Sequence, residues 1–327
     1  MSPRRRRTVN PFATLAAVAA VLVASLAACS PSGGLGTVPS RAPTPAPSVD
    51  QGEPDLTAAP SASSSASAHP IGSPRAEPTP AATTVVRVYF YLGGELGTAG
   101  LVPLLREVPQ TRAVATAAMN ALFEGPTAAE SGEREITSAV PAGSRLLGLT
   151  VENGIATVDL SSEFESGGGS MSIFVRLGQV VYTLTQFPTV DSVLFEIEGQ
   201  PVTVFSSEGI VLDGPIGRDA YADQLPTIYV DRPAYGAAIG NPARITGSAN
   251  TFEASFMITI LDGAGAPIVE TPAMATCGTG CRGTFDVTVP YSVPGAGWGT
   301  LRVWEASAKD GSPQFVRDYP VWLTPAP

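Results

Sequence analysis

The feature that most restricts how this chain folds is the segment of residues 30–83. It is rich in Pro, Ser and Ala and contains no aromatic residue. Such a segment buries too little apolar surface to offset the conformational entropy that its ordering would cost. We therefore expect a flexible linker with an end-to-end distance of roughly 40 Å, and a folded core built only from the residues that follow it.

The residues before the linker resemble an export signal that ends in a cysteine. Arginines occupy positions 4–7, an apolar run covers residues 12–26, and Leu26-Ala27-Ala28-Cys29 resembles the lipobox of bacterial lipoproteins. In that family the chain is cut before the cysteine, and the thiol carries a diacylglycerol. The resemblance implies a signal peptide over residues 1–28, lipidation with palmitate-type acyl chains at Cys29, and anchoring on the extracytoplasmic face of the cell membrane. The alternative is an ordinary secretory signal with a chance cysteine.

The net charge of the chain restricts the class of molecule that it can bind. The sequence has 29 acidic and 19 basic residues, for a formal net charge of −10. Removing the leader removes four arginines and leaves a mature chain of about −14. Nucleic acids need a basic surface, so we expect no nucleic acid among the partners.

The chain is also short of residues for catalysis. His69, in the linker, is the only histidine, and Lys309 is the only lysine. A folded region without imidazole excludes a Ser-His or Cys-His nucleophile and a His-ligated zinc site. Lys309 lies in Ala308-Lys309-Asp310-Gly311, which predicts an exposed hairpin tip. We expect no cofactor and no metal site.

Residues 84–215 have the pattern of an α+β domain. The β-branched and aromatic run at 85–92 predicts a strand. Residues 111–124 predict a helix that Thr111 caps and that Gly125-Pro126 ends.

A hairpin and a second helix follow in the same domain. Asn153-Gly154 between residues 147–152 and 155–160 predicts a β-hairpin, because both turn residues tolerate a positive φ. Residues 170–187 predict a helix, and 193–197 alternate as a final strand. The apolar stripe of the helix consists of Ile173, Leu177, Val180, Val181 and Leu184. The order is roughly β-α-β-β-β-α-β, a small sheet with helices on one face.

Residues 225–323 predict an all-β domain, with many Gly and Pro turns and no helical periodicity. The expected strands are 227–231, 243–249, 254–261, 267–273, 283–290, 300–306 and 314–322. About seven short strands in roughly a hundred residues are typical of an Ig-like β-sandwich, although the Cys and Trp spacing of true Ig domains is missing.

Several motifs resemble known families. Residues 141–147 (PAGSRLL), 158–164 (VDLSSEF) and 179–188 (QVVYTLTQFP) resemble the GerMN, or sporulation and spore germination, domain. Residues 246–254 (TGSANTFEA) and 283–285 (GTF) resemble the Ig-like module that often follows it in bacterial lipoproteins.

This resemblance implies a cell-envelope lipoprotein, whether or not the organism makes spores. Related folds of the sporulation machinery build rings by interacting side by side, and they have no assigned catalytic residues. The resemblance therefore brings no active site to this sequence, and it implies protein partners or self-association.

Two groups of residues have both a chemical and a structural interpretation. Asp159, Glu163 and Glu165 follow a strand and could form a carboxylate pair for glycoside hydrolysis, but a solvent-facing hairpin and a polar connection explain them more simply. Gly167-Gly168-Gly169-Ser170 could bind an anion at a helix N-terminus. We favour a flexible connection with Ser170 as the N-cap.

The aromatic residues of the second domain are open to two interpretations. They are Tyr229, Tyr235, Trp298, Trp304 and Trp322. They could line a sugar-binding face or fill the core, and sequence alone does not place their rings on one face.

The pair Cys277 and Cys281 could be a redox pair, metal ligands or a disulfide. Two thiolates without histidine leave a tetrahedral site incomplete, and the chain is exported, so we expect a structural disulfide.

We therefore expect a non-enzymatic protein-interaction or assembly module, anchored on the membrane by lipid. Its expected partners are envelope proteins or further copies of itself. The first alternative is a module that binds peptidoglycan or another glycan, and the second is a cell-wall hydrolase that uses carboxylates.

Overall fold

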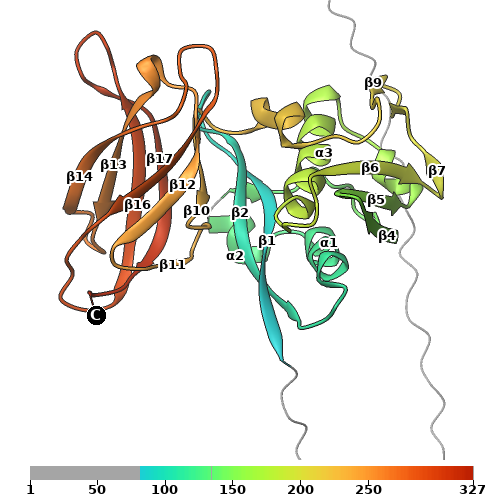
Figure 1. The fold of residues 1–327 in the computed structure, drawn as a ribbon, viewed down its shortest axis with the longest axis horizontal. Helices are drawn as coiled ribbons and strands as arrows, with labels where there is room; N and C mark the ends of the chain where they lie inside the picture. Colours follow the sequence, from blue (N-terminus) through green and yellow to red (C-terminus); the bar gives the residue numbers. More distant parts are fainter. Residues whose placement is uncertain (1–81, 134, 327) are drawn as a thin grey trace, which may run out of the picture. The chain divides into compact units, whose positions relative to one another are not determined.

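The computed structural model describes residues 82–133 and 135–326, which belong to one compact unit. A mixed first region runs from β1 to β9, and a strand-rich second region runs from β10 to β17 (Figure 1). The predicted fold class, an α+β domain followed by an all-β Ig-like sandwich, is confirmed. The signal peptide, Cys29 and nearly all of the linker lie outside the described residues. No helix among the described residues has both the length and the apolar character needed to cross a bilayer.

The first sheet of the first region has the order β2-β1-β3. β1 (Thr83–Leu92) pairs antiparallel with β2 (Gly100–Pro109), and its last two residues pair with β3 (Ile136–Thr137). β2 was not predicted. Its prolines argue against a strand, but β2 is an edge strand of this sheet, where a missing N–H is tolerated.

Two short helices follow β2. α1 (Val114–Glu124) begins later than predicted, and Thr111 does not cap it; the Thr111 hydroxyl instead accepts a hydrogen bond from the Ala113 N–H, which holds a turn before the helix. Gly125 ends the helix with φ of 80°, as predicted. α2 (Ala128–Glu133) was not predicted.

The predicted hairpin is confirmed as β4 (Leu146–Glu152) and β5 (Ile155–Leu160), joined by Asn153-Gly154 with positive φ at both residues. α3 (Ser170–Leu184) then crosses to β6 (Ser192–Ile197), which pairs parallel with β5. The five predicted stripe residues of α3 are all buried. The helix ends three residues earlier than predicted, and Ser170 is its first residue and not its N-cap, which is Gly169.

The first region is a three-layer arrangement and not one sheet with helices on one face. Its second sheet has the order β4-β5-β6-β7, with β7 (Gln200–Pro201) at the edge, and β8 (Val204–Phe205) pairs with β9 (Ile210–Val211). α1 contacts β1, β2 and β4, and α3 contacts β1 and β6. Both helices therefore lie between the two sheets (Figure 1). This position buries most of α3, including its polar side.

The second region is a sandwich of two sheets. All seven predicted strands are present, with ends shifted by a few residues. One sheet is formed by β10 (Ile228–Arg232), β12 (Ala243–Ala249) and β15 (Gly283–Val289). The other has the order β11 (Ala238–Ile239), β17 (Pro313–Leu323), β16 (Gly297–Ala306), β13 (Ser255–Leu261) and β14 (Pro267–Met274). Lys309 lies in the exposed turn between β16 and β17, as predicted.

Candidate functional site

A largely buried carboxylate joins the two regions. Asp231 and Tyr229 lie on the same side of β10, because side chains alternate along a strand. The carboxylate of Asp231 accepts hydrogen bonds from Arg87 Nη1 at 2.7 Å, from the Tyr89 hydroxyl at 2.6 Å and from the Tyr229 hydroxyl at 2.8 Å. Arg87 and Tyr89 belong to β1, so three donors from two regions meet on one acidic group.

Arg218 completes this group from the 3-10 segment that follows the first region, Arg218–Gln224. Its Nη1 lies 3.6 Å from Asp231 Oδ1, and its Nε donates to Thr185 Oγ1 at 2.7 Å. The guanidinium lies over the rings of Tyr182 and Tyr89, at 4.6 Å and 5.5 Å from their centroids. Such cation–π contacts are strongest where water is excluded. We call Asp231, Arg87, Tyr89, Arg218 and Tyr229 the Asp231 cluster.

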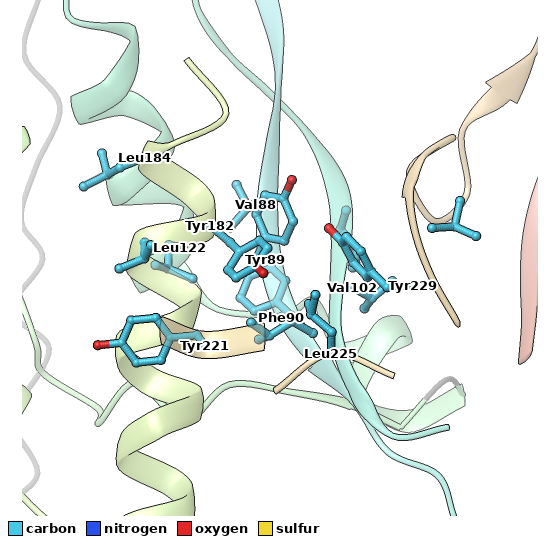
Figure 2. Packing of buried hydrophobic residues seen from close by; sticks show 14 of the residues in the cluster. Val88, Tyr89, Phe90, Val102, Leu122, Tyr182, Leu184, Tyr221, Leu225 and Tyr229 are labelled. Carbon is cyan, nitrogen blue, oxygen red and sulfur yellow. The ribbon is translucent and has the colours of Figure 1, made fainter. Parts of the chain in front are cut away.

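The rings of Tyr89 and Tyr229, which belong to the cluster, pack with the ring of Tyr182. Tyr182 of α3 lies next to Tyr89 of β1, and Tyr229 approaches from the second region (Figure 2). The ring centroids of Tyr89 and Tyr182 are 5.4 Å apart, and those of Tyr182 and Tyr229 are 6.2 Å apart. The buried hydrophobic residues of the two regions form one continuous cluster.

The cluster is fixed in one ionisation state at neutral pH. Burial alone would raise the pKa of Asp231, but the charges of Arg87 and Arg218 and the tyrosine hydroxyls outweigh it, so the pKa is lowered. Burial and the Asp231 charge raise the pKa of Tyr89 to about 12. Burial also raises the pKa of Tyr229. The carboxylate is therefore charged and the phenols neutral, and the cluster has no proton to exchange near neutral pH.

A glycine permits a second contact between the regions. Gly97, in the loop between β1 and β2, has φ of 84°, and a Cβ there would lie 2.5 Å from the ring of Phe315. Its carbonyl accepts a hydrogen bond from the Thr227 N–H at 2.7 Å. Only glycine combines this backbone conformation with so close an approach.

The Asp231 cluster was not predicted, although two features of the sequence point to it. Arg87 interrupts an apolar strand, and Asp231 ends another. A charge in a run that is otherwise suited to burial must find a partner. Pairing the two would have required the relative positions of β1 and β10, which local pattern does not supply.

Two clefts flank the cluster. The arginine cleft, which we define by Arg87, Arg232 and Arg244, has a volume of 680 Å³ and apolar walls that include Val85 and Leu105. The hydroxyl cleft has a volume of 580 Å³. Its polar lining includes Arg218, Arg282, Thr246, Ser248, Thr276 and Thr284.

The three carboxylates suggested for hydrolysis have structural roles. Asp159 Oδ1 accepts from the Gly199 N–H at 2.8 Å, and Glu165 Oε1 accepts from the Ser206 N–H at 3.3 Å. A hydrogen bond from Ser161 is the main reason why the pKa of Glu163 is lowered. A general acid needs a raised pKa, so this shift has the wrong direction.

The glycine-rich connection is held by a buried arginine. Arg176 of α3 is 2% exposed and donates to the carbonyls of Phe164 at 2.6 Å, Gly167 at 2.9 Å and Ala139 at 3.0 Å. The hydroxyl of Ser170 donates to Glu208 at 2.7 Å, so a carboxylate of the chain itself lies at the start of α3. These contacts account for the connection without a bound anion.

The aromatic residues divide into two groups. Tyr229 and Tyr235 are not on the outer sheet face: Tyr229 is in the Asp231 cluster and Tyr235 packs edge-on against Tyr319. By register, the three tryptophans lie on the outer face of the five-stranded sheet. Trp298 and Trp322 are directly opposite, are 52% and 36% exposed, and have ring centroids 5.4 Å apart; Trp304 donates to Thr259 Oγ1 at 3.1 Å.

The structure has a disulfide between Cys277 and Cys281, whose Cα atoms are 5.8 Å apart. It closes a loop between β14 and β15. Among the described residues, no group of three or more His, Cys, Asp or Glu side chains is arranged to hold a metal ion.

Comparison with protein families agrees with the resemblances noted in the sequence. Residues 87–203 match the model of the sporulation and spore germination domain, and residues 227–312 match that of the immunoglobulin-like domain of bacterial spore germination. No curated protein matches the chain.

Several solved structures are similar in part. The first GerMN domain of the sporulation protein GerM from Bacillus subtilis is 21% identical, with coverage of 42% of this chain and 99% of that chain and a TM-score of 0.36. The tandem GerMN domains of the same protein are 14% identical, with 64% and 62% coverage and a TM-score of 0.37. A Clostridium perfringens protein described as a lipoprotein is 18% identical, with 42% and 89% coverage and a TM-score of 0.30.

Proposed function

Because the chain combines a sporulation and spore germination domain with an Ig-like domain of the spore germination type, we propose that it is a binding module of the cell envelope. It is held on the extracytoplasmic face of the membrane by a lipid on Cys29, and it acts by binding other envelope proteins or further copies of itself. It turns over no substrate.

The observation that carries this proposal is the way the fold uses its charged groups. The Asp231 carboxylate is paired with arginines and accepts hydrogen bonds from tyrosines, which lower its pKa, and the pKa of Glu163 is lowered as well. Asp159 and Glu165 accept backbone hydrogen bonds. Acid–base catalysis at neutral pH would need a carboxyl group with a raised pKa, and the pKa values of Asp231 and Glu163 are shifted in the opposite direction.

The anchor is tested by Cys29→Ala. Stable membrane attachment takes more than one acyl chain, which a diacylglycerol provides. The variant should remain uncut and unacylated. A variant that still incorporates labelled acyl chains and still sediments with lipid would contradict this part of the proposal.

Binding without turnover is tested on the full mature chain. Crosslinking in the native membrane should yield discrete adducts, while incubation with purified peptidoglycan should release no soluble fragments. Release of fragments that Asp159→Ala or Glu163→Ala abolishes, with the fold intact, would make the protein a hydrolase.

A second candidate function is glycan binding by the Ig-like region. It is favoured by the exposed pair Trp298 and Trp322 on one sheet face, because aromatic faces of this kind can stack on apolar faces of sugars. The protein should then be retained on peptidoglycan, and replacing both tryptophans by alanine should release it. Phe252→Ala removes an equally exposed aromatic elsewhere and serves as the control.

A further inference from the structure

The arginine cleft carries a positive charge in an acidic protein. Among the described residues, its lining contains three arginines and no Asp or Glu. Arg87 is paired with Asp231, and Arg244 is paired with Asp286 at 2.6 Å. Arg232 is exposed, and no carboxylate of the described residues lies within ion-pair distance of it. With a net charge of −10 on the whole chain, this local surplus marks a place where an anionic group is attracted.

The same cleft exposes apolar side chains. Val85 of β1 is 54% exposed and Leu105 of β2 is 39% exposed, and both line it with Phe187 and Ile239. An apolar wall next to an unpaired cation suits a segment that carries both an apolar side chain and a carboxylate.

A free strand edge adjoins the cleft. The backbone N–H of Arg87 donates to the Gln186 side chain at 2.8 Å, and the side-chain amide of Gln186 donates to the Arg87 carbonyl. Because backbone groups alternate between the two edges of a strand, the N–H and C=O of Val85 point to the same edge as those of Arg87. They lie beyond Gln186, and within residues 82–133 and 135–326 no group is hydrogen-bonded to them. Open edges of this kind accept an added strand.

We propose that the arginine cleft binds an extended peptide segment of a partner protein. The segment adds to β1 at Val85, packs an apolar side chain against that of Val85, and places a carboxylate on Arg232. The inference rests on the proposed function and specifies the chemistry of the partner. A neutral glycan would leave Arg232 without a counter-charge and the strand edge unpaired, so the cleft favours an acidic peptide.

The direct test uses a defined probe. A fluorescent peptide of alternating Val and Glu is titrated with the full mature chain in detergent, and its anisotropy is measured at low and moderate salt. It should bind with an affinity that falls as salt rises, because exposed charges are screened. A matched peptide of alternating Val and Gln should bind at least about tenfold more weakly, as expected for loss of a charge-assisted contact. Equal binding of the two peptides would overturn the proposal.

Variants locate the site. Arg232→Gln should weaken binding of the Val–Glu peptide about tenfold. Arg145→Gln removes an exposed arginine that lies in the first region, outside the cleft, and should leave binding unchanged. Val85→Gln should weaken the binding of both peptides, because it removes the exposed apolar side chain next to the free edge. Equal loss in the Arg232 and Arg145 variants would show a non-specific charge effect. Tighter binding by a chain without residues 30–81 would show that the cleft already holds the protein's own linker. Either result would overturn the proposal.

Crosslinking separates this inference from the proposed function. A photo-reactive residue is placed at position 105 in the cleft or at position 147, an exposed leucine outside it, and irradiated in native membranes. Protein adducts at 105 that Arg232→Gln reduces would support the inference. Adducts at 147 without adducts at 105 would overturn the proposal that the cleft binds a partner, and the proposed function would remain. A lack of adducts at both positions would count against both proposals.

Discussion

The two regions differ in which groups hydrogen-bond to the backbone along the edges of their strands. In the second region, the inner strands pair with a neighbouring strand on both sides. In the first, β3 covers only the end of β1, and side chains of α3 and of the turn that follows it cover part of what remains. Thr183 Oγ1 accepts from the Tyr89 N–H at 3.2 Å, Gln179 Nε2 donates to the Tyr89 carbonyl at 2.9 Å, and Gln186 bonds Arg87.

This difference accounts for one of the recognisable motifs of the first region. Two paired strands need only an alternation of apolar and polar residues, which many sequences supply. Side chains that replace a strand must be polar, of the right length and one helical turn apart. Gln179, Thr183 and Gln186 meet this requirement within residues 179–188, one of the motifs that resembles the GerMN domain.

The largest expected effect comes from the junction between the two regions. Asp231→Ala leaves the partly buried Arg87 without its carboxylate and two tyrosine hydroxyls without their acceptor, at a cost of about 3–5 kcal/mol in the free energy of unfolding. Asp318→Ala removes one partner of an exposed pair with Arg302 and should cost less than about 1 kcal/mol. Urea denaturation measures both, and similar costs would contradict the structural role of the cluster.

The pH dependence of stability tests whether Asp231 stabilises the fold as a charged carboxylate. The folded-state pKa of Asp231 is lowered, so its stabilisation is complete above the unfolded-state pKa of about 3.9 and is lost as pH falls through the folded-state value. The difference in unfolding free energy between the wild type and Asp231→Asn should be constant above about pH 5 and should shrink in acid. A difference that grows on acidification would contradict this assignment.

Elements that depend on residues close together in the sequence were predicted correctly. The Asn153-Gly154 hairpin, the apolar stripe of α3 and seven strands of the second region follow from turn chemistry and periodicity. α2 was missed although Thr127 and Glu130 form a reciprocal capping box, in which each side chain accepts the other's backbone N–H.

The rest depends on contacts between distant residues. β2 was missed because its prolines are acceptable only on an edge strand, and the sequence does not state the strand order. The Asp231 cluster joins Arg87 to a residue 144 positions away, and periodicity contains no information on such a pair.

The second-largest loss of unfolding free energy is expected at the side chains that bond the free edge of β1. Gln179 is fully buried, and its amide also accepts from the Ala139 N–H at 2.8 Å. Gln179→Leu should leave the buried carbonyl of Tyr89 and the half-buried N–H of Ala139 unpaired and cost about 2–3 kcal/mol. Thr150→Val, on the β4–β5 ladder, is the control and should cost under about 0.5 kcal/mol. A neutral Gln179→Leu would mean that packing alone holds α3 against β1.

The smallest effect is expected at the disulfide. The Cys277–Cys281 loop is so short that chain entropy gives at most about 2 kcal/mol. Replacing both cysteines by serine should loosen this loop and leave the second region folded, as amide hydrogen exchange would show. Mass spectrometry of unreduced exported protein should find the two residues joined, and two free thiols would contradict the bond.

The central claim is that the Asp231 cluster makes the two regions one unit, and calorimetry of the full mature chain tests it most directly. The wild type should unfold in one transition at neutral pH. Asp231→Ala should split this into two, with the first and second regions melting separately. Two transitions in the wild type, each unchanged by Asp231→Ala, would contradict the claim.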